Sequence, residues 1–174
     1  MEQGVSQKRI SLREYQRELA ERLRLADSAR SASKLGVQVG EQNWLIDLVE
    51  ASEVLRVPPI TPVPLTRPWF RGVANVRGNL YSVVDFAEFL GTGISGTGED
   101  ARLVLLGERF RSAAALLVDR SLGLRNPAQL RAREPGAVRP AWLRAEYDDD
   151  AGMRWSELDV AGLVRDPEFL AVGT

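Results

Sequence analysis

The chain has 174 residues, 44% of them hydrophobic, which is typical of a single globular domain or of two closely packed halves. Its 23 basic residues nearly balance its 24 acidic ones, so the net charge is −1 and the basic excess of a nucleic-acid-binding protein is missing. Cysteine and histidine are absent, which excludes disulfides, thiolate or imidazole nucleophiles and metal sites built on those side chains. We therefore expect no metal, no cofactor and, outside carboxylate or lysine chemistry, no catalysis.

The N-terminal segment is predicted to be helical over residues 11–26. Ser11 and Glu14 match a capping box, and apolar residues then follow at three- and four-residue spacings. We expect an extension and linker over residues 1–33, whose helix docks on its own body or on a partner. Neither a signal peptide nor a membrane-spanning run is visible, so the protein is predicted to be cytoplasmic unless a partner holds it at a membrane.

From Leu35 onward the pattern changes to short strands separated by turn residues, which is typical of barrels or sandwiches. The prolines between 58 and 68 predict extended and turn geometry, and Ala51–Val57 is predicted as either a helical turn or a strand. Asp85 is expected to cap a short helix, and a last helix over 158–165 is expected to end at Asp166-Pro167. The predicted hairpins join Leu35–Val39 to Trp44–Val49, Val73–Val76 to Leu80–Val84, Arg102–Leu106 to Arg111–Val118, and Ala141–Tyr147 to Met153–Trp155.

Two motifs suggest ligand binding but lack its context. Residues 91–96 read G-x-G-x-x-G, yet a helix is predicted before them instead of the strand that a dinucleotide fingerprint requires. Asp148, Asp149 and Asp150 are consecutive, so their carboxylates should point in different directions and form a solvated turn. We interpret the first motif as a flexible loop and the second as a hairpin turn.

The most distinctive segment runs from Trp69 to Phe86 and reads W-F-R-G-V-A-N-V-R-G-N-L-Y-S-V-V-D-F. It closely resembles the central signature of CheW-like domains, as do the flanking segments at 53–64 and 115–119. The resemblance covers about residues 35–165. Within the family, the chain is most similar to the PilI-type members, the adaptors of type IV pilus (twitching motility) chemosensory systems. The similarity lies in the N-terminal extension, the sequence G-V-A-N-V-R-G and residues 169–172.

The resemblance implies a mostly β fold of two intertwined five-stranded SH3-like barrels, with an N-terminal helix and short additional helices. After the extension over 1–33, the CheW-like domain would occupy 34–170. The first barrel would comprise about 34–70 together with 140–165, and the second about 71–139.

The resemblance also implies a non-catalytic adaptor in a two-component signalling pathway. One face of the first barrel would contact the regulatory domain of a CheA-type histidine kinase, and the groove between the barrels would receive the signalling tip of a chemoreceptor-like protein. Nucleic acid is not expected as a partner, and a membrane is expected only indirectly, through the receptor. The residues expected to bind partners are Gly72, Asn75, Arg77, Gly78, Val54 and Leu55.

Two departures from the family pattern leave local contacts open, namely Tyr81-Ser82 and the glycine-rich segment 91–100. An alternative interpretation is a small-ligand-binding barrel or a carboxylate-based enzyme that uses the inter-barrel groove. A deep pocket around a carboxylate with a strongly shifted pKa would favour that alternative. A third interpretation, a regulatory module fused to a kinase or receiver domain, is disfavoured because no such segment occurs within the 174 residues.

Overall fold

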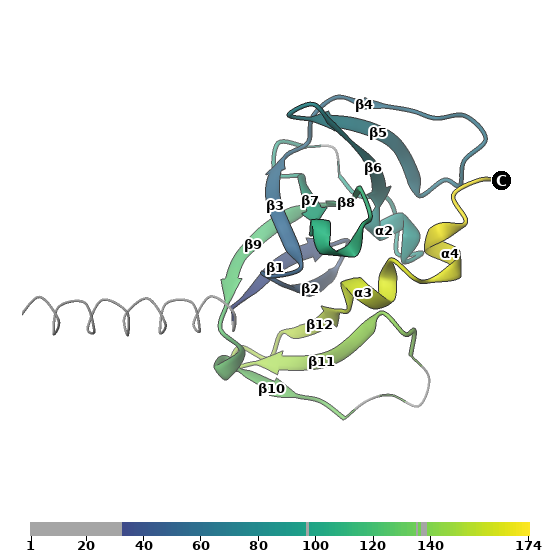
Figure 1. Ribbon diagram of the computed structural model, residues 1–174. Coiled ribbons are helices and arrows are strands. Elements are labelled where there is room, and N and C mark those ends of the chain that lie inside the picture. The colour runs from purple at the N-terminus through teal and green to yellow at the C-terminus, as the bar shows by residue number, and fades with distance from the viewer. Residues whose placement is uncertain (1–32, 97, 135, 137–138) are drawn as a thin grey trace, which may run out of the picture. The chain divides into compact units, whose positions relative to one another are not determined.

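The computed structural model describes residues 33–96, 98–134, 136 and 139–174, and all of these belong to one compact unit (Figure 1). The helix predicted over 11–26 and its linker lie outside the described residues. Within the described part, no helix is long and apolar enough to cross a membrane.

The first sheet, which we call sheet A, combines strands from both ends of the described chain in the order β10-β11-β12-β2-β1-β9. Its pairs are antiparallel except for β12 and β2, which run parallel with Ser156 opposite Trp44. The strands are β1 (Lys34–Val39), β2 (Gln42–Asp47), β9 (Arg120–Arg125), β10 (Leu130–Ala132), β11 (Leu143–Asp149) and β12 (Arg154–Leu158).

The second sheet, sheet B, is formed by the middle of the chain in the order β3-β7-β8-β6-β5-β4. Its one parallel pair joins β6 to β8. The strands are β3 (Ala51–Arg56), β4 (Ile60–Thr61), β5 (Phe70–Val76), β6 (Asn79–Asp85), β7 (Arg102–Leu106) and β8 (Ala114–Val118). Helix α2 (Phe86–Phe89) follows β6, with Asp85 as its N-cap as predicted, and the 3-10 turns η1 (Glu108–Phe110) and η2 (Pro127–Gln129) fall in connections.

Each sheet has six strands, one more than the five expected of each barrel. The two edge strands of sheet B, β3 and β4, are consecutive in the chain and are separated only by Val57-Pro58-Pro59. The edge strands of sheet A, β9 and β10, are likewise consecutive and are separated by four residues that include Pro127. Proline cannot donate to a ladder, so it breaks a strand where the strand bends. In each sheet the first and last strands of the order are therefore neighbours along the chain, and the five-stranded barrels stay a prediction.

The chain passes from sheet A to sheet B between Asp47 and Ala51, and it returns to sheet A between Val118 and Arg120. These points differ from the boundaries expected for the barrels, which placed the first at about 34–70 with 140–165 and the second at about 71–139. The assignment of the chain to barrels stays a prediction.

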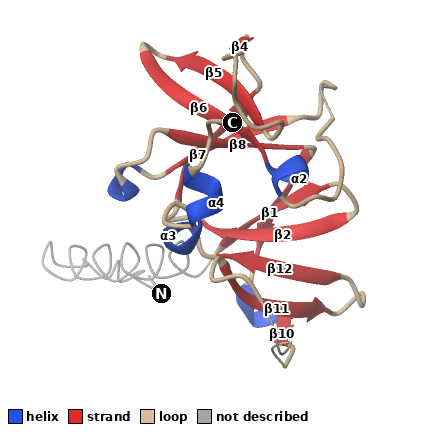
Figure 2. Cartoon of the chain, turned by 90° about the vertical axis from the view of Figure 1, so that its right-hand side faces the viewer, coloured by secondary structure: helices blue, strands red, loops and turns tan. Residues whose placement is uncertain are grey.

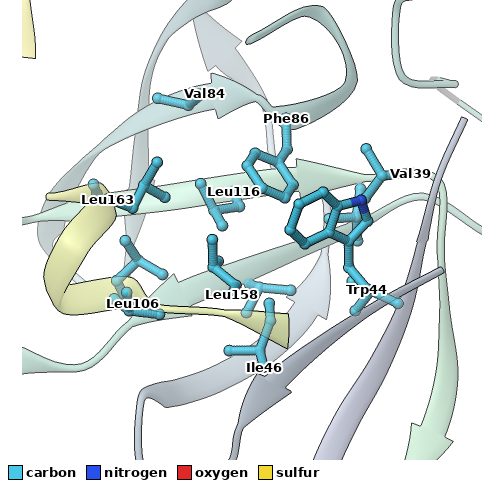
Figure 3. Close-up of a cluster of buried hydrophobic side chains, with 14 of the residues drawn as sticks. Val39, Trp44, Ile46, Val84, Phe86, Leu106, Leu116, Leu158 and Leu163 are labelled. Atoms are coloured by element: carbon cyan, nitrogen blue, oxygen red, sulfur yellow. The ribbon is translucent and has the colours of Figure 1, made fainter. Parts of the chain in front are cut away.

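An apolar layer between the sheets forms the main core (Figure 3). Trp44 and Ile46 on β2 meet Leu106 and Leu116 on β7 and β8, and Phe86 of α2 lies beside Trp44 with ring centroids 5.2 Å apart. The opposite faces of β7 and β8 enclose a second apolar cluster inside sheet B. These two strands are thus buried on both sides, which explains their continuous apolar sequences.

Ion pairs occupy much of the other face of sheet A. The Glu157 side chain is only 3% exposed and accepts hydrogen bonds from Lys34 at 2.8 Å, Tyr147 at 2.7 Å and Arg144 at 3.2 Å. Arg144 also contacts Glu50 at 2.9 Å. Burial opposes ionisation of Glu157, but the bonds from Lys34 and Tyr147 outweigh it and lower the pKa of the carboxyl. Burial and the bond to Glu157 raise the pKa of Tyr147 to about 12.

The C-terminal segment crosses from sheet A back to sheet B (Figure 2). Helix α3 (Val160–Leu163) is shorter than the helix predicted over 158–165, and a further helix, α4 (Pro167–Leu170), follows it. The prediction that the helix ends before Asp166-Pro167 is confirmed, but the further helix that begins there was not predicted. Asp166 accepts hydrogen bonds from the first turn of α4, and proline suits that turn because its N–H needs no partner there. Phe169 of α4 then stacks on Trp69, with centroids 6.2 Å apart.

We expect Glu157→Gln to lower the free energy of unfolding at pH 7 by about 2 kcal/mol, because Lys34 and Arg144 lose the charge of their shared partner. The pKa of Glu157 is depressed in the folded state, so its stabilising effect is complete above the ordinary pKa of about 4.3. The effect is lost as the pH falls through the folded pKa. Urea unfolding across this range should show the difference between the proteins shrinking toward acid. An equal deficit at all pH values, or an equal loss in the exposed control Glu108→Gln, would contradict the assignment.

Candidate functional site

The predicted hairpin between β5 and β6 is present. Its two turn residues are Arg77 and Gly78, with φ of +52° and +89°. Two successive positive φ values are typical of a type I′ turn, which matches the twist of the strands it joins. Asn79 lies opposite Val76 and already belongs to β6. Holding a non-glycine residue such as Arg77 at positive φ costs about 1 kcal/mol.

The side chain of Asn75 stabilises this turn. Its side-chain oxygen accepts a hydrogen bond of 2.8 Å from the backbone N–H of Gly78. The amide group therefore holds the turn closed and sets the direction in which Arg77 leaves the backbone. Asn75 acts as a positioning residue for its neighbour.

Arg77 pairs with Glu53 on β3. The guanidinium donates to both carboxylate oxygens, at 2.7 and 2.8 Å, in the bidentate arrangement that arginine favours. The Arg77 side chain is nevertheless 76% exposed, so the pair adds at most about 1 kcal/mol to stability and its outer edge is accessible to a partner. Leu80 lies next to the turn and is 62% exposed, so the hairpin presents apolar surface beside the charge. The Glu53–Arg77 pair could not be predicted from the sequence, because it joins residues 24 positions apart.

Gly72 is required by close backbone packing. Its φ is +127°, and a Cβ atom at this position would lie 2.1 Å from the carbonyl oxygen of Thr61 on β4. Only glycine allows β5 to pass β4 this closely. Gly72 thereby allows the β5–β6 hairpin, whose turn carries Arg77, to pack closely against β4.

Val54 and Leu55 lie on β3 near Glu53, but they do not share a surface. Successive strand residues point to opposite faces, so Val54 packs against the inter-sheet core and Leu55 against the cluster inside sheet B. Both side chains are half-buried. The structure thus brings together Asn75, Arg77, Gly78 and Glu53 at one turn, with Gly72 at the base of the hairpin.

Comparison with known proteins identifies the family. A family model described as "CheW-like domain" matches residues 34–168, which is most of the chain. The chain belongs to the CheW-like domain family.

Three curated relatives illustrate the range of the match. The chain is 35% identical to Protein PilI of Pseudomonas aeruginosa over 100 residues, which are 58% of this chain and 56% of PilI. It is 32% identical to Chemotaxis protein CheW of Thermotoga maritima over 100 residues, 58% of this chain and 65% of that protein. It is 33% identical to Protein FrzA of Myxococcus xanthus over 88 residues, 51% of this chain and 54% of FrzA. The matches therefore span between half and two thirds of these relatives.

A solved structure agrees with the fold. The scaffolding protein TtCheW from Thermoanaerobacter tengcongensis superimposes with a TM-score of 0.64 at 18% identity, covering 79% of this chain and 95% of TtCheW. The mostly β, two-sheet CheW-like fold predicted from the sequence is confirmed.

The G-x-G-x-x-G segment of this CheW-like domain forms a loop, and two aspartates hold it by hydrogen bonds. Asp85 accepts a hydrogen bond from the Ser95 N–H at 3.1 Å, and Asp119 accepts from the N–H groups of Gly96 and Gly40. Its backbone donors therefore face protein carboxylates, an arrangement that is unsuitable for a pyrophosphate. The aspartates at 148–150 surround the β11–β12 turn, and none of the described residues form an acidic or histidine cluster that could hold a metal.

The alternative of a carboxylate-based enzyme finds little support in the titrating groups. Hydrogen bonds from the Trp155 indole and the Met153 backbone lower the pKa of Asp149, and the pKa of Glu157 is also lowered. A general acid requires the opposite shift. Neither carboxylate lines the groove of about 490 Å³ that lies between sheet A and the segment after α2.

We expect Gly72→Ala to destabilise the CheW-like domain by about 3 kcal/mol or more, because the new methyl group must displace the β4 backbone. Gly78→Ala is the matched control, since its φ is also positive but a Cβ there meets nothing within 4 Å. That variant should lose only about 1 kcal/mol from backbone strain. Chemical denaturation of both proteins checks the order. Equal losses would mean that close approach to Thr61 is not what Gly72 provides.

Proposed function

We propose that this CheW-like domain is a non-catalytic adaptor that couples a chemoreceptor-like (methyl-accepting) protein to a CheA-type histidine kinase. Family membership and the similarity to PilI support a role in a chemosensory pathway that controls type IV pili and twitching motility. The observation that carries the proposal is the Arg77 turn, a charged group held on a stiff hairpin with an exposed outer edge. The protein works in the cytoplasm and reaches membrane-bound receptor arrays through the receptor.

The adaptor transmits a signal through its geometry. Arg77 orients the receptor tip, and its guanidinium retains donors for carboxylates or main-chain carbonyls of the receptor after pairing with Glu53. The kinase regulatory domain contacts sheet B near Val54 and Leu55. The coupling free energy then equals the difference between the free energies with which the adaptor and kinase bind the two states of the receptor.

The direct test is co-elution of the purified chain with the regulatory domain of the cognate kinase, with and without a hairpin fragment of the receptor tip. We expect a binary complex with the kinase domain and a ternary complex when the receptor fragment is added. If neither fragment changes the elution of the chain, the adaptor proposal fails.

We expect Arg77→Glu to remain folded and to abolish receptor-dependent kinase activation, because the turn then presents two carboxylates where the receptor meets a guanidinium. Arg77→Gly should also lose activation while keeping full stability, since glycine accepts a φ of +52° without strain. Autophosphorylation of the kinase in reconstituted receptor complexes measures the activation, and urea unfolding measures the stability.

The exchange variant Glu53→Arg/Arg77→Glu separates recognition from positioning. It restores an ion pair between β3 and the turn but reverses the charge that the turn offers to a partner. If Arg77 contacts the receptor, activation stays lost in this variant. Recovery to wild-type activation would show that Arg77 serves only to hold the hairpin.

A further inference from the structure

A pocket of about 330 Å³ lies at one end of sheet B, between the β5–β6 hairpin and the connection from β7 to β8. The start of β6, directly after the Arg77–Gly78 turn, lines one side of it, and Leu106 and the connection that follows β7 line the other. It shares no residue with the groove between sheet A and the segment after α2. Its volume is at the lower end of the range for ligand sites, which suits one side chain of a partner.

Arg111 in this pocket has a strained backbone, and no contact of its side chain offsets the strain. Its φ is +50°, and Leu65 and Arg77 are the only other non-glycine residues with positive φ in the described part of the chain. The Arg111 side chain is exposed and makes no hydrogen bond or ion pair with another described residue. Backbone strain of this kind is concentrated at functional sites. Arg111 is therefore a candidate for contact with another molecule.

Tyr81 and Ser112 add two hydroxyl groups to the lining of the pocket. Neither hydroxyl is hydrogen-bonded to another described residue, so both can donate to a ligand. The Tyr81 ring packs against the cluster inside sheet B, which holds it in place. The sequence departs from the family pattern at Tyr81, so this hydroxyl gives the pocket a polarity that the family pattern does not predict.

The accessible charge at this end of sheet B is mainly basic. Because β6 and β8 run parallel, the β5–β6 turn and the β7–β8 connection lie at the same end of the sheet. The side chains of Arg77 and Arg109 are 76% and 49% exposed, whereas those of their acidic partners Glu53 and Glu50 are 30% and 6% exposed. Arg111 adds a third accessible guanidinium. Such a surface is complementary to a partner that carries carboxylates.

We propose that this pocket binds one carboxylate side chain of the chemoreceptor-like partner, and that Arg111 selects it. The Arg111 guanidinium and the hydroxyls of Tyr81 and Ser112 donate to the carboxylate, and the exposed Leu80 packs against the partner beside it. Glu108 also lines the pocket and disfavours a second negative charge, so the site admits a single carboxylate. This assignment rests on the proposed coupling to a receptor, and it adds an acidic side chain that the receptor tip must present.

The test measures the affinity of the full chain for the hairpin fragment of the receptor tip. We expect Arg111→Glu to bind the fragment at least about tenfold more weakly than wild type. Arg165→Glu is the matched control, because it makes the same charge change at an exposed arginine outside the pocket, and it should bind like wild type. Changing one acidic residue of the fragment to arginine should restore the binding of Arg111→Glu to within about threefold of wild type, since the reversed pair is again opposite in charge.

Arg111→Gly separates binding from the backbone conformation. Glycine accepts a φ of +50° without strain, so this variant should unfold at about the same urea concentration as wild type. It should nevertheless bind the receptor fragment more weakly, because the guanidinium is gone. A variant that keeps full affinity would show that Arg111 shapes the connection without contacting the receptor, and this result overturns the proposal.

The remaining outcomes distinguish the pocket from the adaptor function. Arg111→Glu binding the fragment as well as Arg165→Glu does, or a loss that no single charge reversal in the fragment restores, overturns the proposal for the pocket and leaves the adaptor function standing. Binding of the kinase regulatory domain should be unchanged in Arg111→Glu, and its loss would assign the pocket to the kinase and overturn the proposal equally. If the wild-type chain does not bind the fragment at all, the adaptor function fails, and the proposal for the pocket fails with it.

Discussion

The two sheets share a single apolar layer, and the relative position of the surfaces on the two sheets depends on it. β7 and β8 contribute side chains to this layer on one face and to the interior of sheet B on the other. Sheet A therefore cannot shift against sheet B without opening a core that contains Trp44, Phe86 and Leu116. Close-packed interiors resist such displacement because each lost contact costs dispersion energy and leaves a void. A surface on sheet B thus keeps a fixed place relative to a surface on sheet A, which is the property that an adaptor requires.

The hairpins could be predicted from the sequence because each depends on neighbouring residues. Alternating apolar residues indicated strands, and the residues between Val76 and Leu80 indicated a turn, which Arg77 and Gly78 form. The pairing of distant strands had no such local signal. β12 joins β2 in parallel across more than a hundred residues, and the Glu53–Arg77 and Arg144–Glu50 pairs are similarly remote. The family resemblance supplied the overall fold, but it could not supply these contacts or the second helix that starts at Asp166.

The four hairpin positions expected to bind partners differ in what they do physically. Gly72 permits the close approach of β5 to β4, and Asn75 and Gly78 close the turn. Arg77 is the one charged side chain among the four, and it is 76% exposed. A shared sequence signature can therefore consist largely of residues that hold one contact in place. Val54 and Leu55 are a different case, because each is partly committed to a separate core and a substitution there would disturb packing as well as any docking surface.

The ion pairs of sheet A also hold strands in fixed positions, here by charged contacts instead of apolar packing. Lys34 comes from β1, Arg144 and Tyr147 from β11, and Glu157 from β12, so one buried carboxylate ties three strands together. Hydrophobic residues would tolerate a slipped register more readily than charged partners, which must meet at hydrogen-bonding distance. A buried ionic network of this kind contributes less to net stability than to a unique arrangement. It fixes β11 and β12 beside β2, and thereby the groove that Trp44, Trp142 and Glu146 line, at the end of sheet A where the inter-sheet core comes to the surface.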